Sequence, residues 1–222
     1  MIKAIYLIKR KPGMELEAFR NYWFTTHADL ALKVPGLRKY VQSHTVLSGY
    51  KKGEPAFDGI AEVWYDDTEA MRKIADLPES RAVNADGRNF MDMRNSGFLL
   101  TREHVIKDGP VSSEMVKYVA FPKRKPGMEV EAYQKYWLEH HGPLAAKIPV
   151  VHRYVQSHVL LSAYRAGMTP VYDGVAETWF DDTNAMRVST TTAEYGAVRA
   201  DEPNFIDLDH LAFIITKEHV KL

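Results

Sequence analysis

Apolar positions recur with a helical period over residues 14–33 and again in the corresponding stretch of the second half. At 3.6 residues per turn, one face of the first predicted helix carries Leu16, Phe19, Trp23, His27 and Leu30. The second predicted helix repeats this face with Val130, Tyr133, Trp137, His141 and Leu144. Burying an imidazole without a partner costs about 1–3 kcal/mol. Each histidine must therefore find a hydrogen-bond partner or line a cavity.

Alternating and continuous apolar runs predict the remaining elements of the first half. We expect strands over residues 2–8, 37–48, 57–65 and 98–105, a helix over 14–33, and a helical segment that begins at Asp66-Asp67-Thr68 and ends before Asp86-Gly87. The order is strand, helix, strand, strand, helix, strand. Such a βαββαβ unit is ferredoxin-like, with an antiparallel sheet and both helices on one face.

The two halves of the chain are repeats of one another. A shift of 114 residues aligns 9–15 with 123–129, and 40–44 with 154–158, without a mismatch. A shift of 115 then aligns 66–68 with 181–183, which indicates a one-residue insertion in the second hairpin loop. A period this long predicts two folded units rather than a solenoid. We therefore divide the chain into domains at 1–106 and 115–222, with a polar linker at 107–114.

A ferredoxin-like unit leaves one face of its sheet uncovered, and a second copy can cover that face. The sequence thus predicts an α+β fold in which two fused units pair through their antiparallel sheets as a dimeric α+β barrel, an intramolecular pseudo-dimer. In the second strand Tyr40, Gln42 and His44 alternate with smaller residues. We expect Glu62 and Trp64 of the third strand to share their face, which would carry the chemistry.

Composition excludes several classes of function. The 222 residues contain 29 Lys plus Arg, 29 Asp plus Glu and no cysteine. The balanced charge predicts no nucleic-acid partner, and the absence of cysteine excludes disulfides and thiolate chemistry. No signal peptide and no apolar run of about 20 residues is present, so we expect a cytoplasmic protein without a membrane partner.

Two repeated sets of polar and aromatic residues are the predicted sites. The proposed acid and base groups are His27 with His44, and His141 with His158, because imidazoles exist in both protonation states near neutral pH. The predicted substrate-binding residues are Tyr40, Gln42, Glu62, Trp64 and Trp23, and in the second copy Tyr154, Gln156, Glu177, Trp179 and Trp137. The alternative is that these side chains are packed and hydrogen-bonded core residues. His104 and His219 are predicted to be exposed.

Four ordered motifs carry a resemblance to a known family. They are Lys-Arg-Lys-Pro-Gly-Met, Trp-x3-His-Gly-Pro-Leu-Ala, Tyr-x-Gln-x-His and Asp-Gly-x-Ala-Glu-x-Trp-Phe-Asp-Asp. Together they resemble the EthD family of the dimeric α+β barrel superfamily. The resemblance implies a small-molecule pocket between sheet and helices and chemistry that needs no metal or other cofactor. The second half keeps His-Gly-Pro-Leu-Ala at 141–145, whereas the first has His-Ala-Asp-Leu-Ala at 27–31.

The leading hypothesis is a cofactor-independent enzyme that moves protons on a carbonyl-bearing or phenolic substrate, as a dehydratase, cyclase, isomerase or other lyase does. A second is cofactor-free oxygenation of an activated phenol. A third is a protein that binds a small ligand without turnover. A facial triad of two histidines and a carboxylate for iron is a weaker alternative. The sequence leaves open whether both sites work and whether the pseudo-dimer associates further.

Overall fold

The computed structural model describes residues 1–222, and the chain forms two compact units. The N-terminal unit contains residues 1–100 and 218–222, and the C-terminal unit contains residues 101–217. The last five residues thus belong with the first repeat. The domain division at 107–114 separates the two repeats along the sequence and stays a prediction.

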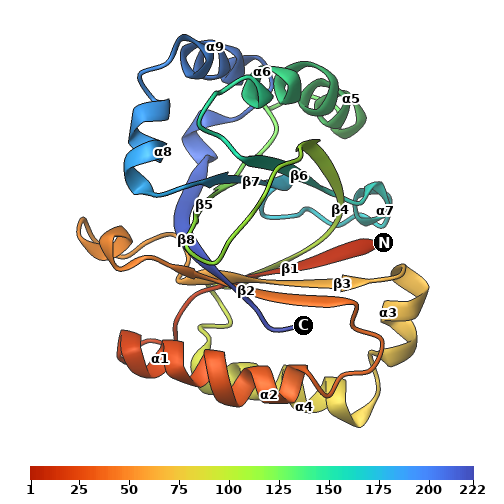
Figure 1. The fold of residues 1–222 in the computed structure, drawn as a ribbon. Helices are drawn as coiled ribbons and strands as arrows, with labels where there is room; N and C mark the ends of the chain where they lie inside the picture. The colour runs from red at the N-terminus through yellow and green to blue at the C-terminus, as the bar shows by residue number, and fades with distance from the viewer. The chain divides into compact units, whose positions relative to one another are not determined.

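The N-terminal unit begins with strand β1 and alternates helices and strands as predicted. Its elements are β1 (Ile2–Ile8), α1 (Leu16–Tyr22), η1 (Trp23–His27), α2 (Ala28–Ala31), β2 (Lys39–Thr45), η2 (Leu47–Tyr50), β3 (Gly59–Tyr65), α3 (Thr68–Ile74), α4 (Pro78–Phe90) and the start of β4 (Gly97–Lys107). Helices α1, α2 and α4 lie along one face of β1, β2 and β3 (Figure 1). None of the chain's helices has the length and apolar character needed to span a bilayer.

Two helix boundaries differ from the sequence prediction. The expected helix at 14–33 is interrupted by a π-helical turn, η1, which ends at His27. The second helical region is two helices, and α4 continues to Phe90, so the predicted end before Asp86 is wrong. Pro78 in the first turn of α4 suits a new helix start, because its missing N–H has no helical partner there. Asp86 and Gly87 therefore lie within a helix.

The C-terminal unit repeats this order. Its elements are the rest of β4, then β5 (Val116–Phe121), α5 (Val130–Tyr136), η3 (Trp137–His141), α6 (Gly142–Ala146), β6 (Arg153–Val159), α7 (Leu161–Arg165), β7 (Gly174–Phe180), α8 (Thr183–Ser189), α9 (Ala193–Asp201), η4 (Glu202–Asn204), η5 (Leu208–His210) and most of β8 (Ala212–Val220). The π-helical turn recurs as η3 and again ends on a histidine.

Each unit has an antiparallel sheet, and its central strand, β3 or β7, is buried over most or all of its length. In the N-terminal unit β3 pairs with β1 and β2, and Tyr40 of β2 exchanges backbone hydrogen bonds with Lys221 and Leu222. In the C-terminal unit the order is β8-β5-β7-β6-β4. Along the chain of strand neighbours the order is β1-β3-β2-β8-β5-β7-β6-β4. The α+β class is confirmed, while packing of one sheet against the other stays a prediction.

Strand register corrects one predicted face. Gln42 lies opposite Ala61, whereas Val41 lies opposite Glu62. Directly opposed residues share a face of the sheet, so Glu62 points away from the face that carries Tyr40, Gln42 and His44. Trp64 lies with Glu62, and Glu177 and Trp179 repeat the arrangement in β7. Alternation within one strand defines two faces but does not say which face of a neighbouring strand matches.

Candidate active site

The N-terminal unit contains a cavity of about 130 Å³ between its sheet and its helices. Its polar lining comes from His27, Tyr40, Asn84 and two further tyrosines, while aliphatic and methionine side chains form most of the remainder. An apolar cavity of about 150 Å³ in a protein core accommodates benzene. The space therefore suits a guest of about one six-membered ring.

His27 reaches this cavity from the last residue of the π-helical turn η1. Its Nδ1 lies 2.8 Å from Asp86 Oδ2. Asp86 also accepts hydrogen bonds from Tyr22 at 2.6 Å and from Asn89 at 2.9 Å. An ionised carboxylate accepts only, so His27 must carry its proton on Nδ1. Because His27 lines the cavity, Nε2 is the nitrogen available to a guest.

Burial sets the ionisation of this pair. Desolvation lowers the pKa of His27 below its ordinary value of 6.5, although Asp86 acts in the opposite direction. Burial also raises the pKa of Asp86, but the hydrogen bonds from Tyr22, His27 and Asn89 outweigh it and the net shift is downward. At neutral pH the dyad is therefore a carboxylate that orients a neutral imidazole, the form that accepts a proton.

Tyr40 lines the same cavity, and a side-chain amide holds its hydroxyl. The Gln42 side-chain amide donates to Tyr40 Oη at 2.7 Å and to the Trp23 carbonyl at 2.8 Å. Burial raises the pKa of Tyr40 to about 12, so the phenol keeps its proton. Since its oxygen already accepts from Gln42, the Tyr40 O–H is free to donate to an oxygen atom of a guest.

His44 does not line the cavity with His27, contrary to the predicted pair. Its ring stacks on Trp23 with centroids 4.2 Å apart. Its Nε2 lies 3.0 Å from Gln42 Oε1, and because both amide hydrogens of Gln42 are used, His44 must be the donor. Burial, with nearby positive charges, lowers the pKa of His44 to about 3. A histidine that stays neutral far below pH 7 holds Gln42 in place but does not exchange protons near neutrality.

The C-terminal unit repeats these contacts. His141 Nδ1 lies 2.9 Å from Asp201 Oδ2, and Asp201 accepts from Tyr136 and Asn204. Burial lowers the pKa of His141 below 6.5 despite the opposing effect of Asp201. Gln156 donates to Tyr154 and bonds His158, which stacks on Trp137 at 4.4 Å.

The histidines predicted to be exposed are half-buried. His219 lies 5.0 Å from the His44 ring, and His104 lies 4.6 Å from the His158 ring. In each case the last strand of one repeat covers the strand histidine of the other, because the ends of β8 and β4 belong to the opposite unit. Single-strand patterning could not show this.

The remaining predicted residues lie elsewhere. Glu62 forms a buried ion pair with Lys3 at 2.8 Å, and Glu177 forms one with Lys117 at 3.2 Å. The two lysines also lie over the rings of Trp64 and Trp179. Trp23 and Trp137 are fully buried against the helix aromatics and the stacked histidines. No three His, Cys, Asp or Glu side chains are grouped to hold a metal ion.

Asp86 and Asp201 were missed from the sequence, although the repeat contains their signal. A shift of 115 aligns Asp86 with Asp201 and Asn89 with Asn204, and a shift of 114 aligns Tyr22 with Tyr136. Polar residues kept in both copies on helices that cover a sheet indicate a shared partner. The sequence pattern around Asp86-Gly87 instead predicts the end of a helix.

Comparison with known proteins places the fold and the family. The model of the EthD domain matches residues 11–94 and again 125–209. An anthrone oxidase-like protein of known structure is 11% identical, with a TM-score of 0.69 over 99% of this chain and 93% of that chain. A mutant chlorite dismutase from Candidatus Nitrospira defluvii is 10% identical, with a TM-score of 0.50 over 98% and 91%.

An EthD family protein from Bacillus halodurans C-125 is 29% identical, with a TM-score of 0.40 over 47% of this chain and 99% of that chain. No curated protein matches the sequence. The structural neighbours support the fold alone, because their identities are low. The matches to both repeats show the family: the chain belongs to the EthD family and carries its domain twice.

Proposed function

We propose that this protein is a cofactor-independent enzyme that abstracts and returns a proton on a small phenolic or carbonyl-bearing substrate. The observation that carries the proposal is that one largely apolar cavity is lined by both His27, which is paired with Asp86, and Tyr40. A dehydratase, cyclase or isomerase needs this combination of a base and a hydrogen-bond donor.

The proposed roles follow from the contacts. His27 Nε2 accepts the substrate proton, and the resulting imidazolium returns it to another atom of the same substrate. Asp86 is a positioning residue that fixes the tautomer and stabilises the imidazolium, as carboxylates do beside catalytic histidines. Tyr40 donates a hydrogen bond to the oxygen on which negative charge develops. The hydrogen bonds from His44 to Gln42 and from Gln42 to Tyr40 hold the Tyr40 side chain in place.

The chromogenic phenol 4-nitrophenol tests the proton transfer directly, because its phenolate absorbs visible light. Wild-type protein at pH 7 should bind it and increase the phenolate fraction. His27→Gln should bind it without that increase, and Asp86→Asn should show an intermediate effect. With a turned-over substrate, His27→Gln should lose about 10²–10⁴-fold in rate. Equal phenolate formation in the wild type and in His27→Gln would show that His27 does not accept the proton.

The pH dependence provides a second check. Because the pKa of His27 is lowered from 6.5, the base form should predominate at pH 7 and be lost as the pH falls through that lowered pKa. A rate that rises with pH above 7 would contradict this assignment. Cofactor-free oxygenation would share the first deprotonation, and a strict requirement for dioxygen in turnover would distinguish it.

A further inference from the structure

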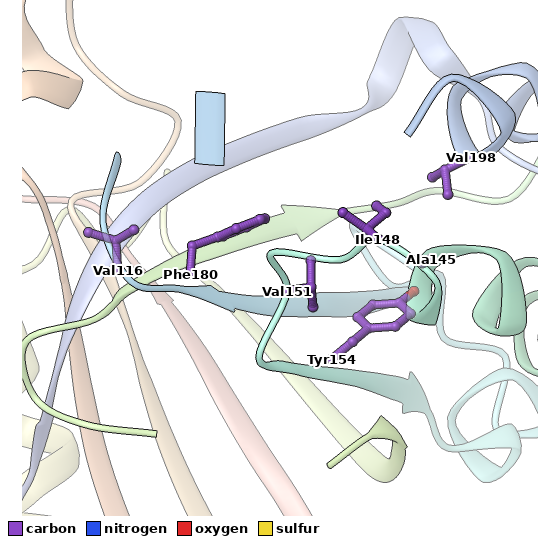
Figure 2. Packing of buried hydrophobic residues seen from close by; sticks show 7 residues of the cluster. All are labelled: Val116, Ala145, Ile148, Val151, Tyr154, Phe180 and Val198. Atoms are coloured by element: carbon purple, nitrogen blue, oxygen red, sulfur yellow. The ribbon is translucent and has the colours of Figure 1, made fainter. Parts of the chain in front are cut away.

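The two halves carry the same dyad but different walls around it. Residues 31, 34, 37, 40, 65 and 83 line the cavity of the N-terminal unit. Their counterparts in the second repeat are Ala145, Ile148, Val151, Tyr154, Phe180 and Val198, which together with Val116 make up one buried hydrophobic cluster. Figure 2 shows these seven side chains gathered between strands and helices. The residues that correspond to much of the wall of the first cavity thus belong to one packed cluster in the second unit.

Two substitutions add volume at this place. The position of Ala4 in β1 is taken by Tyr118 in β5, and the Tyr118 ring packs against the cluster. The position of Gly87, which lines the first cavity, is taken by Glu202. At a third position the difference is reversed, because Tyr6 of the first unit corresponds to Ala120 of the second, which has no ring. The two walls therefore differ in shape as well as in size.

Glu202 is fixed at the position that Gly87 occupies in the first unit. It is buried, with 8% of its surface exposed, and forms an ion pair with Arg199. Arg199 occupies the position of Asn84, an exposed residue that lines the first cavity and so lies at its mouth. Burial, and after it the negative charge of Glu202, raises the pKa of Tyr118, which packs against the same cluster.

We infer that the chain has one working site for single-ring phenolic substrates, in the N-terminal unit, and that the residue at position 87 or 202 decides access. Glycine at 87 leaves room for the ring beside His27. Glutamate at 202, fixed by Arg199, blocks the equivalent approach to His141 and places a carboxylate where an apolar ring would lie. This inference rests on the proposed function and assigns that function to one of its two copies.

Gly87 can accept a side chain without backbone strain. A Cβ built there would meet only Met91 Sδ at 3.5 Å and Met93 Sδ at 3.9 Å, and both belong to flexible side chains. Gly87→Glu and Gly87→Leu are therefore suitable variants that fill the cavity with and without a charge. Gly196→Glu is the matched control, because Gly196 also lies in a helix and has nothing within 4 Å of an added Cβ.

Equilibrium binding of 4-nitrophenol should show one site per chain in the wild type and in Gly196→Glu. Gly87→Glu and Gly87→Leu should weaken binding at least tenfold, with unfolding midpoints measured to confirm that both variants fold. The double variant Arg199→Asn, Glu202→Gly should gain a second site. Two equal sites in the wild type, undiminished binding by Gly87→Glu, or no binding of 4-nitrophenol by the wild type would each overturn the inference.

The two proposals fail in different ways. If the chain has one binding site and that site does not ionise the phenol, the proposed function is wrong. The inference that the residue at position 87 or 202 decides access would still stand. Two equivalent sites that both generate phenolate would support the proposed function and remove the inference that only one copy works.

Discussion

The chemistry of single residues in this protein is set mainly by how far each imidazole is desolvated and by what holds its second nitrogen. His27 has a carboxylate on Nδ1 and a cavity for Nε2, so it remains a usable base. His44 has Gln42 on Nε2 and an indole against its ring, so it is a fixed neutral donor. Two histidines that look equivalent in sequence therefore have different tasks.

The strand histidines should make stability depend on pH. Burial lowers the pKa values of His44 and His158 to about 3. Because the pKa of each imidazole is lower in the folded than in the unfolded protein, its contribution to the free energy of unfolding is complete above pH 6.5. This contribution falls as the pH drops toward 3, by up to about 1.4 kcal/mol per pH unit for each group.

The double variant His44→Gln, His158→Gln should therefore flatten the fall in unfolding free energy between pH 6.5 and 4.5, measured with urea. Each single variant should remove about half of the slope. An unchanged slope in the double variant would show that these imidazoles titrate normally in the folded protein.

Among the elements, the π-helical turns η1 and η3 decide which way His27 and His141, their last residues, point. One extra residue in a turn rotates the side chains that follow it, and such turns concentrate at functional sites. Trp23 and His27 begin and end η1, and the same pair of residue types begins and ends η3. The turn lets the indole pack on the sheet while the imidazole reaches Asp86.

Close packing of η1 on strand β3 depends on Gly59. A Cβ at this position would lie 2.4 Å from the Ser43 carbonyl oxygen and 2.7 Å from the Trp23 ring. Gly59→Ala should destabilise the fold by about 1–3 kcal/mol through overpacking, measured by urea unfolding.

Gly196→Ala is the control for Gly59→Ala, because Gly196 is helical and unobstructed. It should leave stability unchanged or raise it by up to about 1 kcal/mol. A Gly59→Ala protein as stable as wild type would mean that Trp23 can move away from β3 at little cost.

On the scale of the whole molecule, each repeat is completed by the end of the other repeat's last strand. Lys221 and Leu222 bond to Tyr40, and the Lys221 ammonium lies 3.6 Å from the centre of the Phe24 ring. In the same way residues 101–107 of β4 pair with β6. The duplication therefore exchanges strand ends rather than joining two self-contained domains.

Deleting residues 218–222 should loosen the N-terminal unit selectively. Three backbone hydrogen bonds to Tyr40 are lost, each worth roughly 1 kcal/mol, so amide hydrogens of β2 should exchange at least about tenfold faster. Strand β6, which pairs with β4 instead, is the internal control in the same mass-spectrometric experiment. Equal acceleration in β2 and β6 would contradict a local role for the C-terminal residues.

The sequence by itself determined the duplication, the βαββαβ order, the family and the presence of a histidine on the apolar side of each first helix. These follow from local periodicity and from identity between the repeats, which need no long-range information. Only the tertiary structure decided which groups meet. In the structure His44 lies outside the cavity, Glu62 lies on the opposite face of the sheet, and Asp86 contacts His27 although 59 residues separate them along the chain. Strand register and helix packing fix such meetings, and neither is encoded in the pattern of one element alone.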